Sequence, residues 1–183
     1  KQQSNMKTRT KIISLSAIAA LAFASMSFLL KPDYTKSAVT FKIKNAAITV
    51  DGAFKTFEAH IDYNESAKAP SSIKATIKTE SIDTGIEGRD KHLRKEDFFN
   101  VAAFPVITFE STQVLKTTSG SYVAEGKLTI KGVTKDIKIP FTYTNGVFEG
   151  TVTLNRLDYG VGGGSLTMGN DVEVFLKVAA ATK

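Results

Sequence analysis

The chain has 183 residues and no cysteine, and its formal charge at pH 7 is +6. This length fits a single domain, and the lack of cysteine excludes a disulfide framework and any thiolate metal site. Lys1, Lys7, Arg9 and Lys11 supply four of the positive charges, so the charge falls from +6 to +2 without residues 1–24. No basic stripe with interleaved aromatic residues remains, and we do not expect a nucleic-acid partner.

The N-terminal 30 residues differ in kind from the rest of the chain. Basic residues precede an uncharged apolar run from Ile12 to Leu30, which is the pattern of an export signal, and a small-residue motif marks Ala24 as a cleavage point. The same run is also long enough to be retained as a membrane anchor. In either case we expect the domain that follows, residues 33–183, to be periplasmic or secreted.

Alternation of apolar and polar residues predicts an antiparallel strand over Ser37–Lys44, with Phe41 and Ile43 on its apolar face. The segments that contain Phe57 and Ile77 repeat this pattern. We therefore expect half-buried strands in the first half of the domain.

A charged segment, Glu87–Asn100, then interrupts the strands. It has few β-branched residues, and its spacing places Asp90 with Arg94, and His92 with Glu96, four residues apart. This spacing predicts short helical turns.

Alternation resumes after this segment and predicts five further strands. They contain Ile107 and Phe109, Tyr122–Ile130, Val133–Tyr143, Phe148–Leu154 and Val172–Val178. Lys131-Gly132 is expected to form a turn, and Asn145-Gly146 is a strong two-residue hairpin signal. Eight strands without helix–strand alternation predict an all-β antiparallel barrel or sandwich.

Two glycines favour a hollow barrel over a filled one. Gly126 lies on the same apolar face as Leu128, and Gly150 lies on the same face as Val152. Missing side chains at these positions would leave room inside. A β-bulge or a bend of the barrel explains such glycines equally well.

The charged segment also carries a family resemblance. Arg89-Asp90-Lys91-His92-Leu93, followed by Asp97-Phe98-Phe99 and Phe104-Pro105, closely resembles the signature of the YceI-like family of bacterial lipid-binding proteins. Ser37–Phe41, Gly132–Thr134 and Gly169–Val172 also fall where that family has motifs. Lys36 and Asn45 stand where its members commonly have histidines.

The resemblance implies an eight-stranded, lipocalin-like barrel whose interior holds a polyisoprenoid or an isoprenoid quinone. The apolar faces and the charged segment then give a candidate lining: Phe41, Ile43, Phe57, Ile77, Phe98, Phe99, Phe109, Gly126, Leu128, Phe141, Gly150, Val152 and Leu154. Arg89 and His92 are candidates for contact with a lipid head group. An alternative interpretation gives Arg89, Asp90 and Asp97 a structural role, tying the segment to neighbouring backbone.

Catalysis and metal binding have little support in the sequence. His60 and His92 lack the spacing of a metal site, no Gly-x-Ser-x-Gly motif is present, and no cofactor is expected beyond a bound lipid. Two alternatives stay open at this stage: an adhesion module with a packed β-sandwich, and an enzyme that uses His92 with Asp90 or Asp97. Transient contact with a membrane protein or membrane surface, and pairing as a homodimer, are further expectations.

Overall fold

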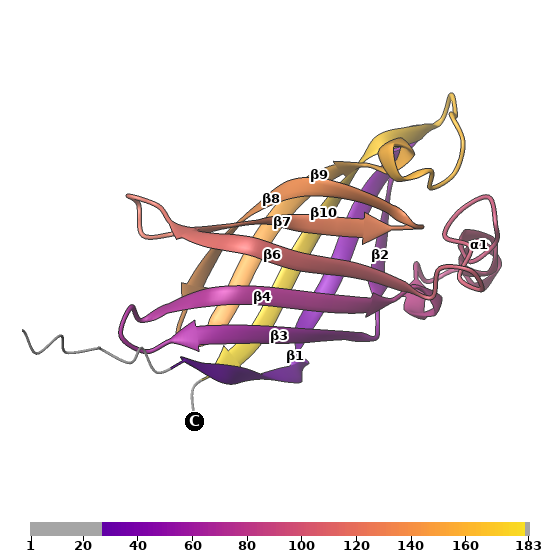
Figure 1. The fold of residues 1–183 in the computed structure, drawn as a ribbon. Coiled ribbons are helices and arrows are strands. Elements are labelled where there is room, and N and C mark those ends of the chain that lie inside the picture. The colour runs from indigo at the N-terminus through magenta and orange to yellow at the C-terminus, as the bar shows by residue number, and fades with distance from the viewer. Residues whose placement is uncertain (1–26, 182–183) are drawn as a thin grey trace, which may run out of the picture.

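The computed structural model describes residues 27–181, which form ten strands and one short α-helix (Figure 1). The strands are β1 (Ser27–Asn45), β2 (Ile48–Phe54), β3 (Phe57–Asn64), β4 (Ala69–Lys78), β5 (Ile82–Asp83), β6 (Val106–Lys116), β7 (Tyr122–Ile130), β8 (Val133–Thr144), β9 (Val147–Asn155) and β10 (Met168–Ala181). The helix is α1 (Glu87–Leu93), and two 3₁₀ turns, η1 (Thr79–Ser81) and η2 (Arg156–Tyr159), follow β4 and β9. Within residues 27–181, no helix combines the length and apolar character needed to cross a membrane.

Eight of the strands close into an antiparallel barrel. The ring runs β1-β3-β4-β6-β7-β8-β9-β10, and β10 pairs back onto β1. This closure confirms the predicted all-β barrel and rules out the open β-sandwich. A closed ring leaves none of its strands as an unpaired edge, which protects the sheet from edge-to-edge association.

The first strand is longer than the alternation predicted. It begins at Ser27 and not at Ser37, and its first residues, Ser27–Leu30, pair with β3 before the strand turns to pair with β10. A register shift follows Asp33, where the Ser37 hydroxyl accepts a 3.0 Å hydrogen bond from Ala179 N and donates one to Asp33 O. The end of the apolar run therefore lies in β1, whereas the predicted export signal otherwise falls on residues 1–26, outside the described residues.

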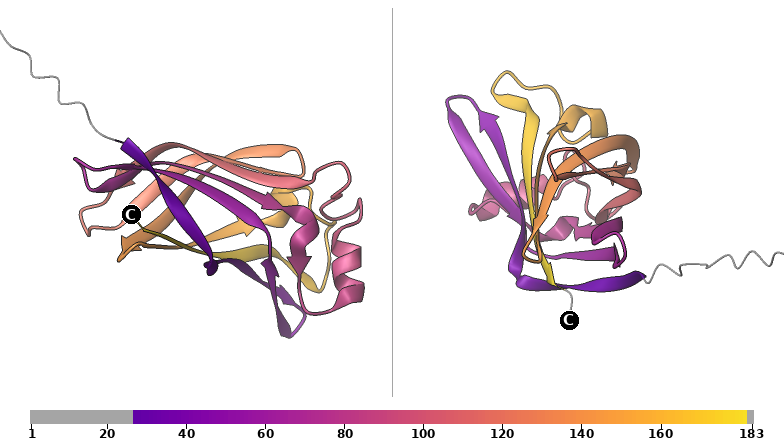
Figure 2. Two further views of the ribbon diagram at one scale, coloured as in Figure 1. Left: turned by 90° about the horizontal axis from the view of Figure 1, so that it is seen from below. Right: turned by 90° about the vertical axis from the view of Figure 1, so that its left-hand side faces the viewer.

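The sequence did not predict β2. This strand pairs with the second half of β1 and, through Ala53 and Phe54, with the two-residue β5. Gly52 interrupts its apolar face because the Phe41 ring occupies that space: a Cβ on Gly52 would lie 2.7 Å from Phe41 Cε2. The β1–β2 hairpin leans away from the ring at one end of the barrel (Figure 2).

The two predicted turns are tight hairpins. Thr144 faces Val147 across Asn145-Gly146, whose φ angles are 51° and 76°. Lys131-Gly132 has nearly the same geometry between Ile130 and Val133. Positive φ at both central positions matches the right-handed twist of the strands and favours Asn and Gly.

The charged segment forms a compact cover at the end of the barrel where β4 ends and β6 begins (Figure 1). Its helix ends at Leu93, earlier than the helical turns expected up to Asn100. Phe99 N donates to Leu93 O, and Asn100 N donates to Lys95 O, with Asn100 at a φ of 47°. The chain therefore continues in turns that direct two adjacent phenylalanines toward the interior.

Candidate functional site

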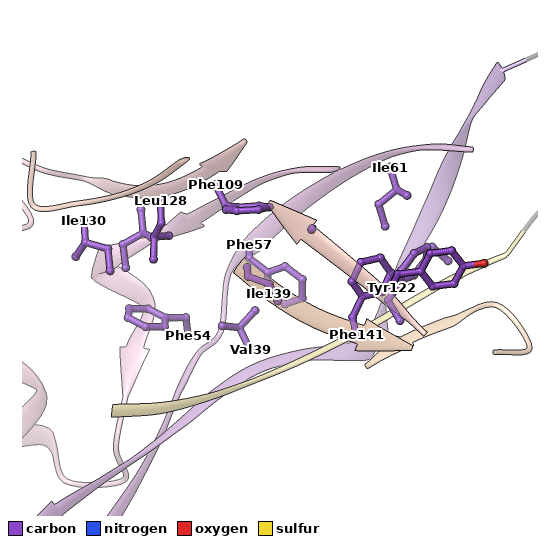
Figure 3. Packing of buried hydrophobic residues seen from close by; sticks show 14 of the residues in the cluster. Val39, Phe54, Phe57, Ile61, Phe109, Tyr122, Leu128, Ile130, Ile139 and Phe141 are labelled. Atoms are coloured by element: carbon purple, nitrogen blue, oxygen red, sulfur yellow. The ribbon is translucent and has the colours of Figure 1, made fainter. Parts of the chain in front are cut away.

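The interior of the barrel is hollow. A cavity of about 280 Å³ lies between the inward faces of the strands. Figure 3 shows inward side chains on opposite walls, with Phe109 and Leu128 on one side and Val39 and Phe54 on the other. An apolar cavity of about 150 Å³ is already large enough to hold a benzene molecule, so this interior has room for a longer apolar group.

Nearly all predicted lining residues reach this cavity. Those that line it are Phe41, Ile43, Phe57, Ile77, Phe98, Phe99, Phe109, Leu128, Phe141, Gly150, Val152 and Leu154. They come from β1, β3, β4, β6, β7, β8, β9 and the charged segment. Gly126 does not line the cavity.

The prediction for Gly126 needs a correction. A bulge separates Ser111 from Gln113 in β6, and a Cβ on Gly126 would lie 2.7 Å from Ser111 Cα. Gly126 thus makes room for the neighbouring backbone and not for a ligand, as the alternative interpretation of the glycines held. Steric demand at a bulge is a common reason for glycine within a strand.

Small side chains on the inward faces create the space instead. Ala59 and Ala75 face each other across β3 and β4, and both line the cavity together with Ala124 and Gly150. Ala59, Ala75 and Ala124 are not among the lining residues predicted from the sequence. Each of these alanines alternates with large apolar residues on the same face of its strand, and this pattern would have identified it as a small lining residue.

The lining is almost entirely hydrocarbon. Its members with polar groups are Thr40, Asn45, Thr84, Arg89, Arg156 and Tyr159. Sequence reasoning missed the group from η2 and the loop after it, Arg156, Tyr159 and Val161, because alternation stops at Asn155. Tyr159 and Val161 are nevertheless buried in the hydrophobic core.

Phe98 and Phe99 close the end of the cavity beneath α1. Phe99 packs edge-on against Phe54 with ring centroids 5.7 Å apart, and Phe98 packs against His92 at 4.9 Å. Gly162, at a φ of 69°, brings loop backbone against Phe98 and donates a 2.9 Å hydrogen bond from its N to Asp97 O. The charged segment and the loop after η2 therefore hold each other in place.

Arg89 and Asp90 connect α1 to the loop before it. Asp90 is buried and accepts hydrogen bonds from the amide and hydroxyl of Thr84, while Arg89 donates to the hydroxyl and carbonyl oxygens of Thr84, each at 2.7 Å. Arg89 also borders the cavity. Its hydrogen bonds agree with the structural role considered for it, and its position leaves a head-group contact as a hypothesis.

His92 and Asp97 form a pair on the outer surface of the cover. His92 Nε2 lies 2.7 Å from Asp97 Oδ2, both side chains are 56% exposed, and His92 does not line the cavity. This hydrogen bond holds the pKa of Asp97 below its usual value. Within residues 27–181, no group of three His, Cys, Asp or Glu side chains is placed to hold a metal ion.

Arg156 is the one buried arginine in the core of the described structure. It is 6% exposed and borders the cavity. Its Nε donates to Gly169 O and its Nη1 to Val161 O, both at 2.9 Å, and its Nη2 lies 3.4 Å from Asn170 Oδ1. Burial lowers the pKa of Arg156, although a guanidinium stays protonated at neutral pH.

A closed eight-stranded antiparallel barrel with an apolar interior defines the lipocalin-like class of small-ligand-binding proteins. Within this class the chain belongs to the YceI-like family, whose domain model matches residues 30–180. A UPF0312 protein of Pseudomonas aeruginosa is 34% identical over 182 residues, which cover 88% of this chain and 95% of the relative. A UPF0312 protein of Shewanella putrefaciens is 30% identical over 161 residues, covering 82% of this chain and 84% of the relative.

Solved structures show the same fold. BcnA of Burkholderia cenocepacia superposes with a TM-score of 0.77 at 28% identity, over 83% of this chain and all of BcnA. The YceI protein of Campylobacter jejuni gives 0.65 at 26% identity, over 73% of this chain and 86% of that protein. A polyisoprenoid-binding domain from Saccharophagus degradans gives 0.63 at 16% identity, over 85% of this chain and 98% of the domain, and shows the fold alone. Family and cavity together fit a lipid-binding protein.

Proposed function

We propose that this protein is an exported carrier that holds one long apolar lipid, a polyisoprenoid or an isoprenoid quinone, inside its barrel. The observation that carries the proposal is the apolar cavity enclosed by the strand ring. Support for the ligand class comes from the Saccharophagus degradans domain, which is described as polyisoprenoid-binding and has this fold.

The apolar tail supplies most of the binding free energy in this proposal. Each CH₂ group moved from water into an apolar site contributes about 0.8 kcal/mol, whereas an exposed ion pair contributes about 0–1 kcal/mol. The lining offers hydrocarbon from every strand of the ring and very few polar atoms. A long, flexible, weakly polar chain therefore matches the cavity better than a polar metabolite of similar size.

Carriage without chemical change is the corresponding mode of action. The histidine–carboxylate pair lies on the outer surface, and the cavity is lined by side chains without an activated nucleophile. The lipid would enter and leave at the end covered by α1 and the loop after η2. Transient contact with a membrane protein or membrane surface would supply and remove it.

The direct test is identification of the lipid that copurifies with the folded protein. The protein is expressed with its N-terminal segment in a bacterium, purified from the periplasm or medium, extracted with organic solvent, and the extract is analysed by mass spectrometry. We expect one prenyl lipid in near-stoichiometric amount. Repeated extracts without any lipid, from protein that is folded by circular dichroism, would contradict the proposal.

The mass of the same purified protein tests whether the chain is exported and cleaved. We expect the intact mass of the purified protein to correspond to a chain cut after Ala24, as the small-residue motif predicts. A mass that includes the whole apolar run, together with recovery only from the membrane fraction, would indicate a retained anchor. Recovery only from the cytoplasm would contradict export.

A further inference from the structure

We propose that Arg156 and Tyr159 form a subsite for an anionic oxygen at the end of the cavity. The preferred ligand is then an apolar chain with a terminal carboxylate or phosphate. This inference rests on the proposed lipid-binding function and deepens it. It places the head group inside the protein and not at the surface pair of His92 and Asp97, and it does not require Arg89.

The first observation is a buried charge without a buried counter-charge. Within residues 27–181, Arg156 is 6% exposed, and no carboxylate lies within 4.0 Å of it, whereas exposed lysines across the barrel surface form ion pairs. Its three acceptors are two carbonyl oxygens and one amide oxygen, all neutral. A charge held in an apolar site without an opposite charge is unfavourable, so an anion that reaches it gains more there than it would at the surface.

The second observation is unused hydrogen-bonding capacity. A guanidinium has five N–H donors in a planar fork, and the three hydrogen bonds of Arg156 use one donor each. The remaining donors suit the paired oxygens of a carboxylate or phosphate, which arginine binds in a bidentate manner.

Tyr159 adds a donor on the same wall. It follows Arg156 in η2, is 3% exposed and lines the cavity. The hydroxyl of Tyr159 accepts or donates no hydrogen bond among residues 27–181, and because no fully buried side-chain oxygen or nitrogen there lacks a partner, a water molecule can reach this hydroxyl. Burial and the nearby Asp158 raise the pKa of Tyr159, so its hydroxyl remains protonated and able to donate.

Paired ligands with the same tail test this subsite. Purified, delipidated protein is titrated at pH 7.5 with dodecanoate and dodecanol, and separately with farnesyl phosphate and farnesol, by displacement of an apolar fluorescent probe. We expect each anion to bind at least roughly tenfold more tightly than its alcohol, the size of one charge-assisted hydrogen bond in a buried site. Comparison of the two anion-to-alcohol affinity ratios, each measured at a constant tail, distinguishes a carboxylate head from a phosphate head.

Variants then locate the preference. Arg156→Met should reduce it to less than about twofold while leaving the affinity for alcohols nearly unchanged, and Tyr159→Phe should reduce it partly. Lys127→Met, which removes an exposed charge that pairs with Asp136, is the matched control and should keep the full preference. Equal binding of anion and alcohol by the unaltered protein, or a preference that survives in Arg156→Met, would overturn the subsite.

An NMR measurement on the unaltered protein tests the subsite even if the variants do not fold. In protein labelled with ¹⁵N-arginine, the anions but not the alcohols should shift the side-chain Nε resonance of Arg156. No shift with bound anion would overturn the inference. Tight binding of the alcohols without anion preference would leave the carrier function standing, whereas failure of all four ligands to bind would refute both.

Discussion

Leu30 lies directly opposite Ile61 in the register of β1 and β3, and the two side chains are only 1% and 2% exposed. This contact joins the start of β1 to the ring, while the rest of β1 pairs with β10. The residues that complete the barrel on this side therefore belong to a segment whose sequence resembles the end of an export signal. Cleavage after Ala24 would leave this contact intact.

Leu30→Ala should destabilise the folded protein by about 3 kcal/mol, because it removes a fully buried side chain and leaves a cavity in the wall of the ring. Urea unfolding followed by circular dichroism measures this change. Leu29→Ala is the matched control, since Leu29 is 52% exposed and should change the free energy of unfolding by less than about 1 kcal/mol. Equal effects of the two substitutions would show that β1 does not close the barrel as described.

Ala75→Phe should weaken binding of a lipid chain by roughly tenfold or more, because Ala75 lines the cavity and the added ring would occupy part of it. Titration with a fluorescent fatty acid or prenyl probe measures the effect. The control is Thr76→Phe, which adds the same ring at the adjacent position outside the cavity. Unchanged binding in the folded Ala75→Phe protein would place the lipid elsewhere.

Gly126→Ala should lower stability without changing the ligand preference of the protein that still folds. The added Cβ would press on the backbone of Glu110 and Ser111 at the bulge in β6, and backbone cannot move aside as a side chain can. We expect a loss of about 2 kcal/mol in the free energy of unfolding. A stable Gly126→Ala protein with reduced lipid uptake would instead support a lining role for Gly126.

The His92–Asp97 pair predicts a local response to acid. Because the folded protein lowers the pKa of Asp97 from an ordinary value of 3.8, the stabilisation is fully present above that value and is lost as the pH falls through the lowered pKa. The protection factors of the amides of residues 95–100 against hydrogen exchange should therefore fall below about pH 4. Asp97→Asn should remove this component of the acid response, and an unchanged response in that variant would refute the assignment.

The eight ring strands could be predicted because each has one face toward the cavity and one toward water. Apolar and polar residues therefore alternate along each strand. The start of β1 and the whole of β2 could not be predicted in this way. Phe28 and Leu30 continue an apolar run that resembles an export signal, so the start of β1 was hidden. Gly52 removes a side chain from the apolar face of β2, and only the position of the Phe41 ring explains that absence.

The candidate lining was predictable for the same reason, whereas the polar end of the cavity was not. Arg156 follows β9 directly, and nothing in its sequence neighbourhood shows that its charge would be buried. That outcome depends on the loop after η2, which folds back so that Val161 and Gly169 accept hydrogen bonds from the guanidinium. Contacts made by irregular segments carry no periodicity from which to predict them.

The most direct test of the central claim is a crystal structure of the protein purified with its natural ligand. We predict continuous, elongated electron density inside the ring, between Phe109 and Leu128 on one wall and Val39 and Phe54 on the other. Density for protein side chains that fill this interior, with any lipid bound only on the outer surface, would contradict it.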